Sequence, residues 1–234
     1  MLSAIAIVPS APVLVAELAG DAAAETTALR AAATTAAAAL GPRWIVLGAA
    51  ESDGRYGPQS RGTFAGYGAD VPIALSPGAL SPGALDAAPV PLPLCVLIAG
   101  WLRGVAAPAA EAEVLALSSG LDPDDAWGRG QELRAELDRT GEPVGVLVVA
   151  DGFPTLTAAA PGGYDPQSVD TQTVLDDALA AGDAEALRQT PPGVVGRVAY
   201  QALGGLAAPG PRATEELYRG APYGVGYFVG LWTP

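Results

Sequence analysis

The sequence contains no histidine and no lysine, so all 12 of its basic residues are arginine. A Ser-His-Asp triad needs an imidazole to accept the serine proton, a Schiff-base enzyme needs an amine, and a P-loop needs its lysine. Zinc and non-haem iron sites use His or Cys ligands, and the chain has one thiol, Cys95. These absences leave carboxylate chemistry, Mg²⁺ or Ca²⁺ held by oxygen ligands, and simple binding.

Positive charge is also scarce, because 25 acidic residues outnumber the arginines and give a formal net charge of −13. This balance argues against a nucleic-acid partner, which requires a basic face, and against anionic membranes. No apolar run approaches the roughly 20 residues of a spanning helix, and the first basic residue is Arg30, so no secretory signal is expected. A single cysteine in an apolar run predicts a buried, inert thiol. We expect a cytoplasmic protein without a membrane or nucleic-acid partner.

What the chain has in abundance is apolar residues, at 50% of its length. Short branched runs alternate with alanine- and leucine-rich segments from end to end, which predicts an α/β fold. We expect a single domain over residues 1–234, with a mixed, largely parallel central β-sheet and helices on both faces. The expected strands are residues 3–8, 44–48, 71–75, 114–117, 145–150 and 223–232. The expected helices are residues 21–40, 92–104, 126–140, 170–181, 183–189 and 194–207.

Glycine and proline residues indicate where loops interrupt the expected helices and strands. Residues 50–70 and 151–168 are predicted to be long loops that follow buried strands, where α/β folds place their sites. Gly128-Arg129-Gly130 is interpreted as a loop at a helix start, and Gly204-Gly205 as a break in the last helix. The tandem pentapeptide of residues 76–85 predicts a surface loop.

Four stretches of the chain resemble one known family. They are residues 7–15 (IVPSAPVLV), 44–48 with 62–68, 148–157 continuing to 166 (VVADGFPTLT, then APGGYDP), and 218–227 (YRGAPYGVGY). In this order they are similar to class III extradiol ring-cleavage dioxygenases of the B-subunit type and their Memo-type relatives. The third and fourth stretches are the most specific, and together the four span nearly the whole chain. The resemblance implies an α/β fold with a site at the strand ends.

The same resemblance implies that the family's iron site is lost. In the family, two His and one carboxylate hold a ferrous ion, and a further His acts as acid or base. Ser10 stands at the first His position, and the second falls near Ala50 and Glu51. The loop His falls near Pro154, and Arg219 stands about where the carboxylate would be. Without these ligands we expect no iron, no other cofactor and no catalytic residue.

The first functional hypothesis is therefore a non-catalytic relative that binds a small molecule or a protein partner at the former active-site mouth. Arg219 would hold an anionic carboxylate or phosphate, or would pair with Glu51 or Asp151 and only plug the cavity. The tyrosines 67, 218 and 223 would stack on an aromatic ligand or simply pack. The expected mouth residues are Ser10, Glu51, Asp53, Asp151, Thr155, Arg219 and Tyr223.

Two alternatives remain open at this point. Glu51 or Asp53 could work with Asp151 as acid and base or bind Mg²⁺, in which case a raised carboxyl pKa in a closed pocket is expected. Alternatively, the chain could be a scaffold or regulatory subunit, or form a homo-oligomer, through the strand 223–232. An exposed Trp232 would favour the partner hypothesis, and a buried one would favour core packing.

Overall fold

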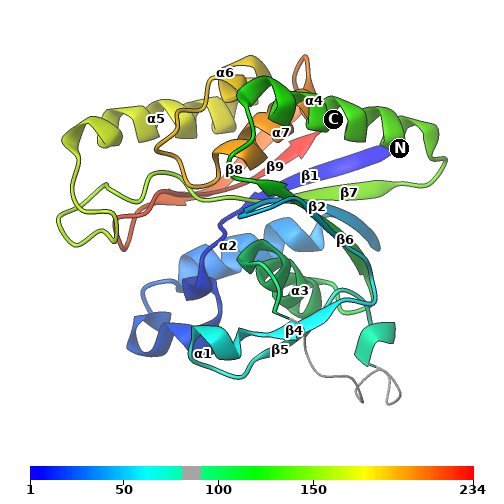
Figure 1. Ribbon diagram of the computed structural model, residues 1–234, viewed down its shortest axis with the longest axis horizontal. Helices are drawn as coiled ribbons and strands as arrows, with labels where there is room; N and C mark the ends of the chain where they lie inside the picture. Colours follow the sequence, from blue (N-terminus) through cyan, green and yellow to red (C-terminus); the bar gives the residue numbers. More distant parts are fainter. Residues whose placement is uncertain (81–90) are drawn as a thin grey trace.

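The computed structural model describes residues 1–80 and 91–234. The second copy of the pentapeptide, residues 81–85, lies outside the described residues. A seven-stranded sheet forms the middle layer, and helices cover both of its faces (Figure 1). This architecture confirms the single-domain α/β fold with a mixed, mostly parallel sheet.

The strand order of the main sheet is β3-β6-β2-β7-β1-β9-β8. The four inner strands β6, β2, β7 and β1 run parallel, whereas β3, β9 and β8 pair antiparallel. All six residues of β7 are buried, which explains its continuous apolar sequence. The strands are β1 Leu2–Val8, β2 Arg43–Ala50, β3 Gly54–Tyr56, β6 Glu111–Ser118, β7 Val144–Val149, β8 Ala213–Gly220 and β9 Tyr227–Thr233. A separate two-stranded sheet pairs β4 Arg61–Thr63 with β5 Pro72–Ala74.

Two groups of helices enclose this sheet (Figure 1). One face carries α1 Ala16–Ala19, α2 Thr27–Ala38 and α3 Leu94–Ala106. The other carries α4 Pro123–Arg139, α5 Pro166–Ala181, α6 Ala184–Arg188 and α7 Arg197–Ala207. The aspartate side chains that accept hydrogen bonds from backbone amides cap three of these helices: Asp122 caps α4, Asp165 caps α5 and Asp183 caps α6. Within the described ranges, no helix combines the length and apolar character needed to cross a membrane.

Several predicted boundaries differ from the structure. The helix expected from residue 21 begins at Thr27, because residues 20–23 form a short 3-10 turn. The loop expected over residues 50–70 contains β3 and β4, and residues 72–74 pair with β4 instead of the main sheet. The strand β8 was not predicted, because its edge position leaves polar residues on a largely exposed strand.

The glycine predictions were wrong in a consistent way. Gly128 and Gly130 lie inside α4, and Gly204 and Gly205 lie inside α7, which runs through them without a break. These two helices pack directly against each other. Cys95, in contrast, is fully buried as expected, and burial raises the pKa of its thiol to about 12.

Candidate functional site

A cavity of about 380 Å³ opens where the carboxyl ends of β1, β2 and β7 meet. Parallel strands place their carboxyl ends at one edge of the sheet, which is the usual location of sites in this class of fold. Most of the lining is apolar, and the polar side chains come from Ser10, Asp151 and Tyr227. The apolar and backbone lining consists of Ala11, Pro12, Ala49, Leu94, Val149, Ala150, Pro161, Val195, Gly196 and Val225.

The ends of two neighbouring strands position Asp151. The β1 strand ends at Val8, and Pro9 begins the loop that carries Ser10. The Ser10 amide donates to Asp151 Oδ1 at 2.8 Å, and the Ala150 amide donates to the Val8 carbonyl at 2.9 Å. The Gly196 amide, just before α7, donates to the backbone carbonyl of Asp151 at 2.8 Å. The loop after β1 therefore holds the carboxyl group, and the segment before α7 holds the backbone of the same residue.

Burial dominates the electrostatics of Asp151. The residue is 7% exposed, and desolvation raises the pKa of its carboxyl group to about 7, although the Ser10 amide opposes the shift. Two buried tyrosines, Tyr200 and Tyr227, also have raised pKa values because of burial and of the nearby Asp151 charge. The carboxyl group of Asp151 therefore changes between its protonated and ionised forms near pH 7, whereas an exposed aspartate is already ionised at that pH.

Three oxygen atoms from residues at this cavity have no hydrogen-bond partner among the described residues. Within residues 1–80 and 91–234, the hydroxyls of Ser10 and Tyr227 form no hydrogen bond, and Asp151 uses only Oδ1. No buried side-chain oxygen of these residues lacks a partner, so the three oxygens are open to the cavity or its mouth. The Tyr200 hydroxyl, in contrast, donates to the Ala150 carbonyl at 3.0 Å.

Of the expected mouth residues, the structure brings Ser10 and Asp151 together at the cavity and places Arg219 elsewhere. Arg219 Nη2 and Nη1 bind Glu216 at 2.6 Å and Asp177 at 2.8 Å, so the expected pairing with Glu51 or Asp151 is wrong. Because β8 has a bulge between Glu216 and Tyr218, the carboxylate three residues earlier comes within reach of the guanidinium. Arg219 instead lines a separate cavity of about 250 Å³ beside α5.

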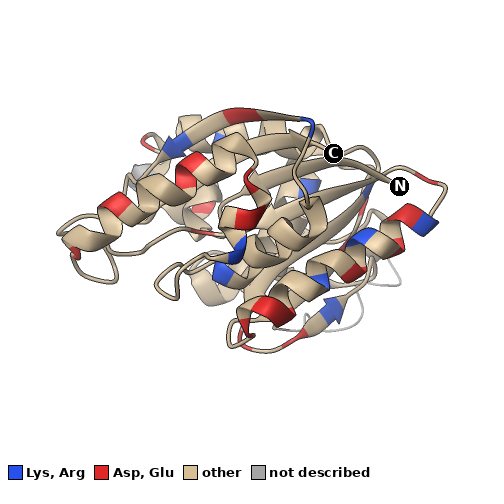
Figure 2. Cartoon of the chain, turned by 90° about the horizontal axis from the view of Figure 1, so that it is seen from above, with Lys and Arg blue, Asp and Glu red and all other residues tan. Residues whose placement is uncertain are grey.

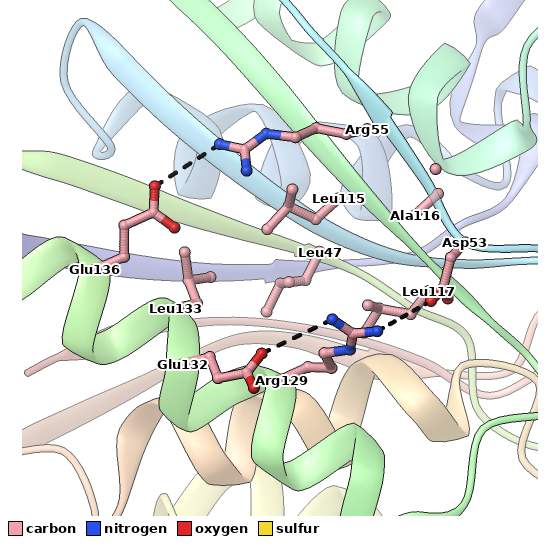
Figure 3. A pocket seen from close by; sticks show the side chains of 11 residues that line it. Leu47, Asp53, Arg55, Leu115, Ala116, Leu117, Arg129, Glu132, Leu133 and Glu136 are labelled. Atoms are coloured by element: carbon pink, nitrogen blue, oxygen red, sulfur yellow. Dashed lines mark hydrogen bonds and ion pairs between the residues drawn. The ribbon is translucent and has the colours of Figure 1, made fainter.

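Asp53 lies at a third cavity, of about 380 Å³, between α4 and the β3–β6 edge of the sheet (Figure 3). Its Oδ1 accepts from the Ser118 amide at 2.7 Å, and its Oδ2 pairs with Arg129 at 3.3 Å. Leu47, Leu115 and Leu133 form an apolar floor, and the arginines on the rim are paired with carboxylates (Figure 3). Asp53 is therefore part of an ion-paired rim and not of the Asp151 site.

The three remaining expected mouth residues do not line the Asp151 cavity either. The Thr155 hydroxyl donates to Ser168 Oγ at 2.8 Å, and the Tyr223 hydroxyl donates to Glu25 at 3.1 Å. The Glu51 side chain is exposed, and its carbonyl accepts from the Ser118 hydroxyl at 3.3 Å. Tyr227 was not among the expected mouth residues, although it ends the VGY segment of the fourth family-like stretch. Its place at the start of β9 brings it to the cavity.

The side chains at the positions where the resemblance expects iron ligands do not fit a ferrous ion. Ser10 offers a poor hydroxyl donor, Arg219 is a cation, and the chain has no imidazole. Over the two described ranges, no three His, Cys, Asp or Glu side chains are grouped as metal ligands.

Trp232 is the residue that was expected to distinguish a partner surface from core packing. Trp232 is 1% exposed, and its indole donates to the Leu179 carbonyl at 2.9 Å, so it packs in the core. An exposed Trp232 would have favoured the partner hypothesis, and the buried one favours core packing instead.

Figure 2 shows basic and acidic positions interspersed along α4, where Arg134 pairs with Asp138 at 3.0 Å. Exposed pairs of this kind contribute little to stability.

Comparison with known proteins shows the fold alone. No protein-family model and no curated protein matches the sequence. The chain is similar in structure to the uncharacterized protein JW3007 from Escherichia coli K12, with a TM-score of 0.58. The match covers 98% of this chain and 99% of that chain, at 11% sequence identity.

Proposed function

We propose that this chain is a non-catalytic relative of the B-subunit-type extradiol dioxygenases that binds a small organic molecule in the Asp151 cavity. The observation that carries the proposal is a buried carboxyl group with a free oxygen in an otherwise apolar cavity. Ligand sites are commonly concave and apolar, with a few convergent polar groups and a residue of perturbed pKa. The cavity at the end of β1 and β7 has all of these properties.

The position of the cavity also supports the proposal. Ser10 and Asp151 come from the first and third family-like stretches, and Tyr227 and Val225 come from the fourth. These segments are far apart in the sequence, and the fold brings them to one edge of the sheet. The oxygens of Ser10, Asp151 and Tyr227 without a hydrogen bond to a described residue are open to the cavity or its mouth. A ligand can therefore bind them without breaking a hydrogen bond within the protein.

A screen of small organic molecules tests the proposal. Protein-observed NMR should find compounds that shift the amides of Asp151, Gly196 and Val225. The Ala49→Leu variant, which adds three carbons to the cavity wall, should lose most of this binding. Glu51→Gln is the matched control, because Glu51 follows the same strand and lies outside the cavity. Binders that ignore Ala49→Leu, or shifts confined to other surfaces, would contradict the proposal.

The raised pKa favours a second candidate, an enzyme that uses Asp151 as a general acid or base. A carboxyl group that titrates near the working pH is suited to proton transfer, and Tyr227 lies at the same cavity. Compounds found in the screen should then be converted, with a rate that inflects near pH 7. Asp151→Asn should abolish turnover while Asp151→Glu retains part of it. Binding without turnover across the pH range would leave the non-catalytic proposal in place.

A further inference from the structure

We infer that the ligand of the Asp151 cavity is a small organic amine, bound as its ammonium cation. This inference rests on the proposed ligand-binding function and names the chemical class of the ligand.

The charge at the cavity has one sign. Among the residues that the structure describes, Asp151 is the single carboxylate that lines the cavity, and no arginine lines it. Arg219 is held by Glu216 and Asp177. Arg197, at the start of α7, donates to the carbonyls of Ser119 and Leu121 at 2.9 Å each and lines a neighbouring cavity. A carboxylate or phosphate ligand would therefore meet the charge of Asp151 without a balancing cation.

The Gly196 and Arg197 amides at the start of α7 do not offer an alternative anion site. The Gly196 amide donates to the Asp151 carbonyl at 2.8 Å, and the Arg197 amide donates to Val194 at 3.2 Å. These groups are engaged, so they cannot hold an anion. The expectation of an anionic ligand, which depended on Arg219, has no support at this cavity.

The free oxygens match an ammonium group. An ammonium group has three donors and no acceptor. The cavity offers the free Asp151 oxygen and the hydroxyls of Ser10 and Tyr227, all of which accept hydrogen bonds. An ionised carboxylate and an ammonium form a charge-assisted hydrogen bond, about twice as strong as a neutral one. The ammonium group of the ligand would place a positive charge next to Asp151, which none of the described lining residues does.

The rest of the cavity suits an apolar body attached to the amine. Pro12, Leu94, Pro161, Val195 and Val225 contribute aliphatic surface around the polar end. A ring or short hydrocarbon chain buries apolar area there, at about 25 cal/mol per Å². The cavity volume of about 380 Å³ lies in the range of small-molecule sites.

Three compounds with one ring and different head groups test this inference. Benzylamine, benzyl alcohol and benzoate are titrated into the full chain by NMR and calorimetry at pH 8, where Asp151 is ionised. We expect benzylamine to bind about tenfold or more tightly than benzyl alcohol, and benzoate to bind most weakly. Asp151→Asn should remove the preference for the amine, and Glu51→Gln should keep it. Cavity amides, including those of Asp151 and Val225, should report the binding.

The outcomes separate this inference from the proposed function. Benzyl alcohol binding as tightly as benzylamine, or benzoate binding most tightly, would overturn the amine assignment and leave ligand binding intact. The assignment also fails if the wider screen yields cavity ligands among which amines show no preference. If no compound of any class shifts the cavity amides, the proposed function itself fails. A preference for benzylamine that survives Asp151→Asn would place the amine outside the cavity and overturn the inference.

Discussion

Asp151→Asn is expected to increase the free energy of unfolding at pH 8 and to change it far less at pH 4. Asn keeps an oxygen to accept the Ser10 amide, which Asp151 now accepts at 2.8 Å. The variant removes the cost of holding a carboxylate that is 7% exposed and has no cation among the described residues of its cavity. A buried residue that costs stability and lines the cavity at the strand ends is what a binding site predicts.

The sign follows from the two pKa values. In the unfolded chain the carboxyl group ionises near pH 3.9, and in the folded chain it ionises near pH 7. Between these values the folded state holds a proton that the unfolded state has released, so stability falls as pH rises from about 4 to about 7. Each pKa unit corresponds to about 1.4 kcal/mol, so the stabilisation by Asn reaches up to about 4 kcal/mol above pH 7.

Urea unfolding of the wild type and Asp151→Asn from pH 4 to pH 8 measures this difference. Asp176 also has a pKa raised by burial, to about 6, and contributes to the slope of both proteins, so the difference between them isolates Asp151. The hydroxyls of Tyr200 and Tyr227, the other titratable groups near Asp151, stay neutral over this range because their pKa values are raised above 10. Glu51→Gln, an exposed carboxyl beside the same edge, is the control. Parallel stability curves for wild type and Asp151→Asn would contradict the prediction.

The buried strands were the most predictable part of the fold. The run of β7 is apolar at every position because both faces of a central parallel strand are covered. The end of this strand places Asp151, and the end of β1 places Ser10, so these two members of the site follow from strand boundaries alone. The sequence of the edge strand β8 carries no such signal, because the strand is largely exposed and its polar and apolar residues alternate only weakly.

The rest of the site depended on three-dimensional detail. The position of Arg219 is set by a bulge in β8 and by acidic groups on α5 and β8. Neither feature has a signature in the sequence. Tyr227 reaches the cavity because β9 returns antiparallel to β1 and starts at the edge where β1 ends. Asp53 lies outside the Asp151 cavity and pairs with Arg129, 76 residues further along the chain.

Glycines gave the clearest conflict between local propensity and packing. Glycine in a helix interior lowers helix stability by about 1 kcal/mol relative to alanine. For this reason the sequence predicted breaks at the glycines of α4 and α7. The structure shows what they permit. A Cβ atom on Gly130 would lie 1.9 Å from the Ala202 carbonyl oxygen, and one on Gly205 would lie 2.0 Å from the Trp127 carbonyl oxygen. The two helix backbones are in direct contact at these glycines.

Gly130→Ala is therefore expected to lower the free energy of unfolding by about 3 kcal/mol or more, because a helix backbone cannot move aside as a flexible side chain can. Gly128 is the matched control: it lies two residues earlier in α4, with no atom within 4 Å of an added Cβ. Gly128→Ala should increase stability by about 0.5–1 kcal/mol through helix propensity. Urea unfolding of both variants measures the contrast. Since propensity favours alanine equally at both positions, opposite signs would isolate the helix contact, and equal effects would mean that α4 and α7 pack less closely than described.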